Sequence, residues 1–517
     1  MTDVAAAIEG APPDRPPPVS ALRSARPKAK RVHTRVSIAI PNSTPASHDV
    51  TGRTGGASSR YIVTTTPWAK SLILTLDGGG IRGYSSLIIL RALMREIASI
   101  EQTLEPKALS SAHTERIDSD KIPDHVLRKG QYLPCHYFDY IAGTSVGGLI
   151  AIMLGMLGKS VDDCITEFQR QNKSLPLPDD LPVVGIEFPL LHRRTTWPTR
   201  RTRSFFDTFA KFSVTATAKA RGNSHQQSSP TNSQGSGDAE SAATADSVEF
   251  RKDTLQCQTL AWCTEVEEPH RERRPYAFAT YKEDLEDTQK LISIPEVAKA
   301  ITTPWSPSFK PFKLGSGQFV DGSKQIRDPT LEVLKEITTM LSEPGEPPID
   351  LLLSLGTDEH QAWFYERLRR PSSTASEASR SREDINKEKN RSYNQYHRFE
   401  VTDIKLGFRK KYFLKEIEEA TMKWLETDHQ KEHLKRYAEF LVKRRRERAA
   451  TVRWEVFALG VRYYCFHDEC KDVDREWDGR GEFHEHLDRK HRLTKEVAKG
   501  RLDRETELDK GRRFGCA

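Results

Sequence analysis

The 517-residue sequence lacks any long uninterrupted apolar run and contains little cysteine. No stretch approaches the roughly 18 apolar residues that a transmembrane helix needs, and the N-terminal segment turns polar and proline-rich too soon for a signal peptide. Seven cysteines, of which only Cys465 and Cys470 lie close together with histidines nearby, do not suggest a disulfide framework. These absences favour a reducing compartment. We expect a cytoplasmic protein with peripheral membrane contact.

The composition is polar for a folded chain, with 36% hydrophobic and 30% charged residues. The apolar residues must therefore be concentrated in some regions, while other regions cannot form a core. The formal net charge of +7 is mild for this length. It fits weak attraction to anionic membranes or nucleic acid, but it identifies neither partner, and it says nothing about oligomeric state.

Length and composition predict several units. Residues 1–65 are rich in Pro, Ser, Thr and Arg, which is typical of a disordered leader. The main folded unit is expected at 66–357, with a low-complexity insertion at 214–247. A polar insertion and a helical extension follow at 358–450, and a basic C-terminal region occupies 451–517.

Strand and helix patterns alternate along the main unit, which predicts an α/β fold. The apolar run at 71–76 predicts a buried strand, and the apolar spacing in 85–100 predicts a helix. A second strand, turn and helix are expected within 137–158. Further elements are expected at 254–264, 276–281, 295–301, 319–321, 330–341 and 349–355. Beyond them, the sequence predicts a Lys- and Glu-rich helix within 396–425 and a charged helix at 430–449.

The first glycine-rich turn, Asp-Gly-Gly-Gly-Ile-Arg-Gly at 77–83, lies between an expected strand and an expected helix. It contains the Gly-x-Gly-x-x-Gly pattern of dinucleotide-binding proteins, but no acidic residue stands at the usual distance behind it. Successive glycines also let several backbone N–H groups point one way, which suits an anion or a transient oxyanion. A plain tight turn is the simplest alternative.

The second turn, Gly-Thr-Ser-Val-Gly at 143–147, is a Gly-x-Ser-x-Gly pattern where a strand meets a helix. A nucleophile elbow requires that context. The sharp turn presents the hydroxyl of Ser145, and Gly143 and Gly147 avoid collisions with the neighbouring strand and helix. The sequence therefore predicts a nucleophilic serine.

A serine hydroxyl needs a base to become an effective nucleophile. His360, just past the expected strand at 349–355, is the best candidate for a Ser-His-Asp triad, although an exposed loop histidine is the favoured interpretation. Asp321, at the end of an apolar strand and before a glycine, is the alternative base. Partial shielding from water would raise its basicity toward what proton abstraction needs.

Three segments in this order resemble the patatin-like phospholipases, particularly those of fungal type. They are DGGGIRG at 77–83, GTSVGG at 143–148 and the Asp-Gly pair at 321–322. The resemblance runs from about Leu72 to Thr357. It implies a three-layer α/β/α sandwich with a mainly parallel sheet, to which the charged C-terminal region adds helices.

The resemblance also implies a chemistry. Ser145 would be the nucleophile and Asp321 the proton acceptor, with no histidine. The substrates would be acyl esters of glycerolipids such as phospholipids, and no cofactor or metal would be needed. The backbone of the first turn would form the oxyanion hole, with Arg82 nearby. The residues of this turn are Gly78, Gly79, Gly80, Arg82 and Gly83.

The third motif departs from the family pattern. Ser323 stands where the family usually has Gly or Ala, and Arg327-Asp328-Pro329 replaces a typical Asn-Asn-Pro. These changes place charge beside the expected site. They keep open an alternative function, a catalytically impaired patatin-fold protein that binds lipid or nucleic acid.

A Cys-x4-Cys pair followed after fifteen residues by His-x4-His resembles a degenerate C2H2 zinc finger at 465–491. Phe483 and Leu487 are its expected core residues, and His484 is a competing ligand. Zinc there would be structural, because four protein ligands leave no open position. The alternative is a charged helical tail. The four expected ligands are Cys465, Cys470, His486 and His491.

The basic run Lys443–Arg448 lies upstream of this region. Such a run can contact nucleic acid or an anionic membrane, but a solvated helix face is the commonest outcome and is the expectation here.

Overall fold

The computed structural model describes twelve stretches of the chain, all within the second of two units, Met1–Gly52 and Arg53–Ala517. The predicted leader at 1–65 and the predicted insertion at 214–247 lie outside the described residues. His360 lies outside them as well. The described stretches are 66–107, 110–174, 249–267, 272–282, 292–304, 310–341, 348–357, 384–387, 392–402, 404, 413–470 and 476–515.

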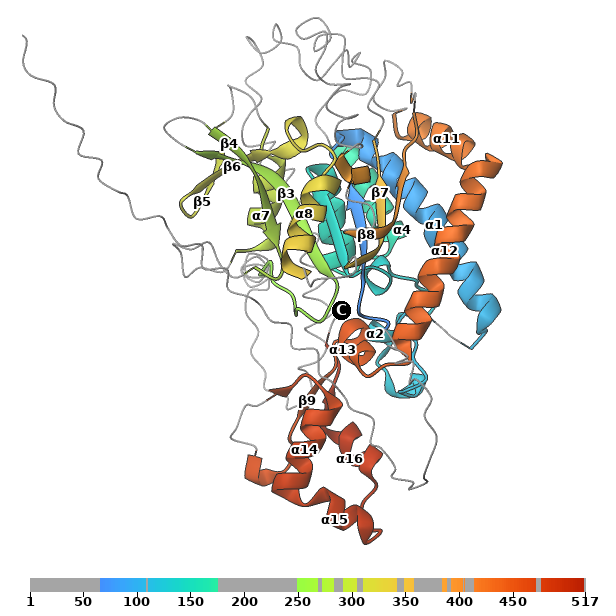
Figure 1. Ribbon diagram of the computed structural model, residues 1–517, viewed down its shortest axis with the longest axis vertical. Coiled ribbons are helices and arrows are strands. Elements are labelled where there is room, and N and C mark those ends of the chain that lie inside the picture. Colours follow the sequence, from blue (N-terminus) through green and yellow to red (C-terminus); the bar gives the residue numbers. More distant parts are fainter. Residues whose placement is uncertain are drawn as a thin grey trace, which may run out of the picture. The chain divides into compact units, whose positions relative to one another are not determined.

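The centre of the fold is an eight-stranded mixed sheet in the order β5-β6-β3-β2-β1-β7-β8, with β4 also paired to β3 (Figure 1). Strands β3, β2, β1, β7 and β8 run parallel, whereas β4 and β6 pair antiparallel with β3. The strands are β1 (Ser71–Leu76), β2 (Tyr140–Thr144), β3 (Gln258–Glu267), β4 (Glu272–Ala279), β5 (Phe312–Leu314), β6 (Gly317–Asp321), β7 (Ile349–Leu355) and β8 (Tyr393–Phe399).

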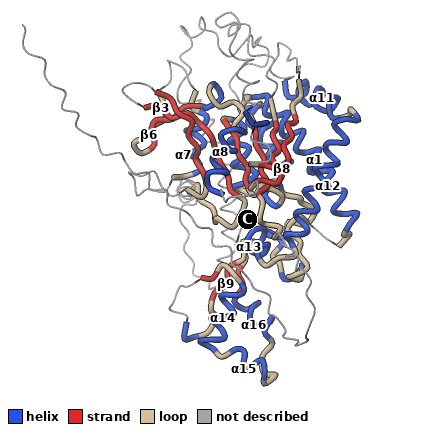
Figure 2. The backbone as a smooth tube through the Cα atoms, in the orientation of Figure 1, coloured by secondary structure: helices blue, strands red, loops and turns tan. Residues whose placement is uncertain are grey.

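Helices cover both faces of this sheet, as Figure 2 shows. Strand β1 explains why: Leu72, Leu74 and Leu76 pack into the core beneath α1, α3, α7 and α12, whereas Ile73 packs into the core beneath α8. This alternation is the period of a strand buried on both sides. The predicted α/β/α sandwich with a mainly parallel sheet is therefore confirmed. The helices of this part are α1 (Gly83–Leu104), α2 (Asp124–Leu127), α3 (Val146–Ala151), α4 (Val161–Ser174), α7 (Ile294–Thr302), α8 (Thr330–Leu341), α11 (Phe413–Leu425), α12 (Asp428–Ala449) and α13 (Arg453–Leu459).

The prediction of a helix is wrong for residues 396–399, which form the end of strand β8. Strand β8 pairs in parallel with β7, so the sheet includes residues well past 357. The residues of β8 are more polar than those of a typical buried strand. Several of them bind buried polar side chains, and a hydropathy pattern does not reveal such partners. The predicted Lys- and Glu-rich helix begins only at Phe413, as α11.

The expectation of a solvated basic face at Lys443–Arg448 holds for the exposed Lys443 but is wrong for Arg445 and Arg448. On α12, Arg445 and Arg448 are buried, at 2% and 1% exposure. Arg445 Nε lies 3.0 Å from a carboxylate oxygen of Glu101 on α1, and Arg448 lies 2.9 Å from Asp139, just before β2. Arg444 pairs with Asp350 on β7 at 2.5 Å. These arginines therefore attach α12 to the main unit through ion pairs with its acidic side chains.

The C-terminal region contains a three-stranded sheet in the order β10-β9-β11. Phe483 and Leu487 are fully buried there, as predicted. They share a core with Ile122 and Leu127 of the main unit. The elements are β9 (Arg462–Tyr464), β10 (Glu476–Trp477), α14 (Arg480–His491), α15 (Leu493–Ala498), α16 (Arg504–Gly511) and β11 (Arg512–Arg513).

Candidate active site

Ser145 stands in a sharp turn between β2 and α3. Its φ of +53° and ψ of −121° are rarely adopted by a residue with a side chain. A Cβ on Gly143 would lie 2.2 Å from the carbonyl oxygen of Gly147, and a Cβ on Gly147 would lie 2.5 Å from the carbonyl oxygen of Leu76. Both flanking positions must therefore be glycine for the turn to close, as the elbow interpretation requires.

Strand β3 brings Asp321 to this turn across 176 residues of sequence. Trp262 on β3 pairs with Thr144, and the next residue, Cys263, pairs with Asp321. Ser145 and Asp321 therefore lie on opposite sides of Cys263. The Oγ of Ser145 donates a hydrogen bond of 2.5 Å to Oδ2 of Asp321. The two residues singled out in the sequence meet in the structure.

The other carboxylate oxygen of Asp321 is bound by Ser323, the residue that departs from the family pattern. Oδ1 accepts hydrogen bonds from the Ser323 hydroxyl at 2.6 Å and from its backbone N–H at 2.8 Å. Burial raises the pKa of Asp321 above that of an ordinary aspartate, and the hydrogen bonds from Ser145 and Ser323 partly oppose this rise. A raised pKa makes the carboxylate a better proton acceptor.

The glycine-rich turn lies beside the elbow, since an ideal Cβ on Gly78 would stand 3.4 Å from the Cβ of Ser145. The N–H of Gly78 donates to the carbonyl of Arg327 at 2.8 Å, so it is not free for an oxyanion as the resemblance implied. No bond from the N–H of Gly79 or Gly80 appears within the described part of the chain. These two amides are the remaining candidate donors.

The rest of this turn passes into α1 through the short 3₁₀ turn Gly80–Arg82. Gly80 has a φ of +56°, in the left-handed region that favours glycine. A Cβ on Gly83 would stand 3.0 Å from the Val146 side chain, so Gly83 lets α1 start close to the elbow. Arg82 is partly exposed at the end of the 3₁₀ turn.

Arg398 on β8 is a residue of this site that sequence reasoning missed. Its guanidinium binds both carboxylate oxygens of Asp77, at 2.6 and 3.1 Å, and also Asp328 and Glu400, at 3.1 Å each. The charge that Asp328 brings to the site is therefore compensated. Burial raises the pKa of Asp77 to about 7, although Arg398 lowers it. No local signal marks the role of Arg398, because Asp77 and Asp328, the partners that tie it to the site, lie 321 and 70 residues away.

Among the described residues, no histidine hydrogen-bonds to Ser145 or Asp321. His360 lies outside the described residues, so the Ser-His-Asp triad remains an untested hypothesis. The two-residue pair is thus the arrangement that can be described.

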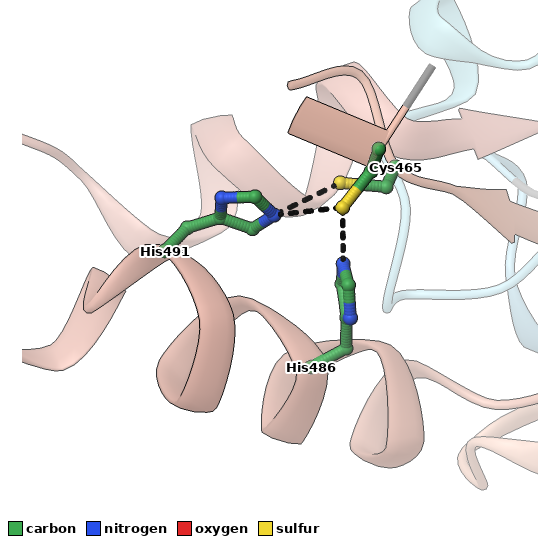
Figure 3. A group of neighbouring side chains, drawn as sticks. Cys465, His486 and His491 are labelled. Atoms are coloured by element: carbon green, nitrogen blue, oxygen red, sulfur yellow. Dashed lines mark hydrogen bonds between the residues drawn. The ribbon is translucent and has the colours of Figure 1, made fainter. Parts of the chain in front are cut away.

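The four expected metal ligands come together in the C-terminal region, in a group that we call the Cys/His cluster: Cys465, Cys470, His486 and His491. Their ligand atoms all lie within 4.8 Å of one another. Figure 3 shows the imidazoles of His486 and His491 converging on the sulfur atoms, with N–S distances of 3.3, 3.4 and 3.7 Å. His484, the competing ligand, turns instead toward Asp488 at 3.3 Å.

The three N–S separations are those expected around one tetrahedral ion, and the other pairs of ligand atoms lie within 4.8 Å of one another. Zinc bonds of about 2.3 Å to sulfur and about 2.0 Å to nitrogen put neighbouring ligand atoms roughly 3.3–3.8 Å apart. The donor set of two thiolates and two imidazoles is that of structural zinc sites.

Fold and site together define an α/β protein with a serine elbow beside a glycine-rich turn. The model of the family "Patatin-like phospholipase" matches residues 74–332, and the chain belongs to this family. Membership supports lipid acyl hydrolysis in general, a chemistry that needs no cofactor. A comparison with curated proteins finds no match. None of the described helices combines the length and the hydropathy that crossing a bilayer requires.

Proposed function

We propose that the protein is a serine lipid acyl hydrolase of the carboxylic-ester type, which cleaves acyl esters of glycerolipids or phospholipids. In this proposal Ser145 is the nucleophile and Asp321 is the general base. The observation that carries the proposal is the 2.5 Å hydrogen bond from the strained Ser145 to the partly buried Asp321. The substrate would be reached at a membrane surface, by peripheral contact, in a reducing cytoplasmic compartment.

The reaction would proceed in two halves. Ser145 Oγ attacks the ester carbonyl carbon as its proton passes to Asp321, and the N–H groups of Gly79 and Gly80 stabilise the oxyanion. The intermediate collapses to an acyl-enzyme, and the departing alcohol takes the proton back. A water that loses its proton to Asp321 then attacks the acyl group. The fatty acid leaves and Ser145 is restored.

Three variants test this assignment on a panel of lipid esters. Ser145→Ala and Asp321→Asn should each abolish hydrolysis, because the first removes the nucleophile and the second leaves it without a base. His360→Ala should keep the wild-type rate. Full activity in Ser145→Ala would remove the assignment, and a large loss in His360→Ala would favour a Ser-His-Asp triad.

Ser323 and Asp328 motivate the alternative function, a patatin fold that binds lipid or nucleic acid without turnover. A fluorophosphonate probe separates the two cases, since it reacts only with an activated serine. Labelling of wild type that disappears in Ser145→Ala supports the hydrolase. A wild-type protein that stays unlabelled supports the binding protein.

We also propose that the Cys/His cluster binds one structural zinc ion. The support is the fit of the three N–S separations to a tetrahedral ion and the packing of Phe483 and Leu487 beside it. Metal analysis of the purified protein should give one zinc per chain, and His486→Ala should lose it. His484→Ala is the matched control and should retain zinc. Equal zinc in His486→Ala and wild type would refute the site.

A further inference from the structure

The conformation of the glycine-rich turn depends on contacts from outside the turn. Three successive glycines have more backbone freedom than any other tripeptide, so such a turn does not hold one shape by itself. Oxyanion stabilisation, however, depends on donors that are fixed before the reaction begins. Whatever holds this turn therefore contributes to the rate.

The holding contacts come from the end of the parallel sheet. The side chain of Asp77, which opens the turn, is only 3% exposed, and its carboxylate receives two bonds from Arg398. The hydroxyl of Thr357 donates to the carbonyl of Gly78 at 3.3 Å, and the carbonyl of Arg327 takes the Gly78 N–H. The charged contact is the one from Arg398.

Arg398 is built into the sheet rather than added to its surface. It stands on β8 opposite Ser354 of β7, which in turn stands opposite Thr75 of β1. The guanidinium donates to the Ser354 hydroxyl at 2.7 Å, and Gly356 leaves room for it, since a Cβ there would lie 2.6 Å from a terminal nitrogen. These contacts with β7 fix the orientation of the guanidinium toward Asp77.

The electrostatics require a cation at this position. Asp77, Asp328 and Glu400 all lie within 3.1 Å of the same guanidinium. Without it, partly or fully buried carboxylates would face one another, and the turn would have to move to let water reach them. A lysine provides one point charge and cannot replace the planar bidentate contact of the arginine with Asp77.

We propose that Arg398 is a positioning residue for catalysis, which holds the Gly79 and Gly80 amides in their oxyanion-binding arrangement by clamping Asp77. The inference rests on the proposed function, because the arrangement matters only if an oxyanion forms. It also extends the working site to β8, beyond the segment 74–332 that defines the family.

The test compares Arg398→Lys and Arg398→Gly with the wild type on a soluble short-chain ester. Both should lower kcat by about 10- to 100-fold with little change in KM, because the misplaced donors act only in the transition state. Added guanidinium ion should restore part of the kcat of Arg398→Gly and leave that of Arg398→Lys unchanged. Arg444→Lys is the matched control. Arg444 pairs with the carboxylate of Asp350 at the opposite end of β7 from Ser354, so this variant should keep the wild-type kcat.

Two results would overturn the inference. One is a folded Arg398→Lys with wild-type kcat. The other is equal loss in Arg398→Lys and Arg444→Lys, with no rescue of Arg398→Gly, which would indicate a general structural effect. Should both Arg398 variants fail to fold, Asp77→Asn takes their place, since it keeps the shape of the side chain and removes the charge that the clamp binds. Its kcat should fall with KM unchanged, and a wild-type kcat would refute the clamp.

Ser145→Ala, measured in parallel, separates this inference from the proposed function. An active Ser145→Ala removes the proposed function itself. An inactive Ser145→Ala beside a fully active Arg398→Lys removes only the role of Arg398.

Discussion

Replacing Glu101 by glutamine should cost much of the stability of the main unit. Glu101 on α1 is fully buried, and its two oxygens lie 3.0 Å from Arg445 and 3.2 Å from Arg446. Glutamine has almost the same shape but no charge, so the buried guanidinium of Arg445 would lose its counter-ion. Breaking a buried ion pair from one side typically costs about 3–5 kcal/mol. That is a large share of the roughly 5–15 kcal/mol by which domains are stable.

Urea denaturation followed by circular dichroism measures this loss as a shift of the midpoint at unchanged slope. Glu418→Gln is the control, because Glu418 forms a more exposed pair with Arg91, at 36% and 17% side-chain exposure. Such a pair should contribute at most about 1 kcal/mol. A double change, Glu101→Met with Arg445→Leu, should be less destabilising than Glu101→Gln, since no buried charge is left alone. A loss below about 1 kcal/mol in Glu101→Gln would refute this view of α12.

Four further outcomes are expected. Esterase activity should decline on acidification at a higher pH than an ordinary aspartate would give, because Asp321 must be ionised to accept a proton and burial raises its pKa. Ser323→Ala removes a hydrogen bond that lowers this pKa, so a pH–rate profile should show the acidic limb moving to higher pH; an unmoved limb would argue against Asp321 as the base. Gly147→Ala should abolish activity in the same assay, because its Cβ would lie 2.5 Å from the backbone oxygens of Leu76 and Asp77. A zinc chelator should lower the melting temperature of wild type and leave that of His486→Ala unchanged, as the proposed zinc site requires.

The parts of the fold that sequence could predict are those governed by neighbouring residues. The strand at 71–76 and the helix at 330–341 have the bounds expected from their apolar patterns. The elbow at Ser145 was predictable because its stereochemistry demands glycine at fixed positions on either side. Asp321 was reachable mainly through the family resemblance, since no local feature separates it from an ordinary turn aspartate.

The parts that could not be predicted depend on charges that meet across long stretches of chain. Arg448 was expected on a solvated helix face and Arg398 carried no prediction, because Asp139 and Asp77, the carboxylates that they bind, lie 309 and 321 residues away. Hydropathy counts both as surface residues and gives no sign of the strand or helix face that buries them. The engaged amide of Gly78 was hidden for a similar reason, since its acceptor, Arg327, belongs to a distant loop.

The inward-facing arginines of α12 have a consequence for synthesis on the ribosome. Asp139 and Glu101 belong to the first third of the described chain, and their cations on α12 emerge only after some 300 further residues. Domains tend to fold as units during translation. Until α12 has emerged, the nascent main unit carries acidic side chains that lack their cations and cannot be buried. It should therefore remain incompletely folded and sensitive to proteases, although Ser145 has already been synthesised. Completion of the main unit is thereby deferred until α12 has been made, and a ribosome that stalls before residue 444 would hold an unfinished main unit.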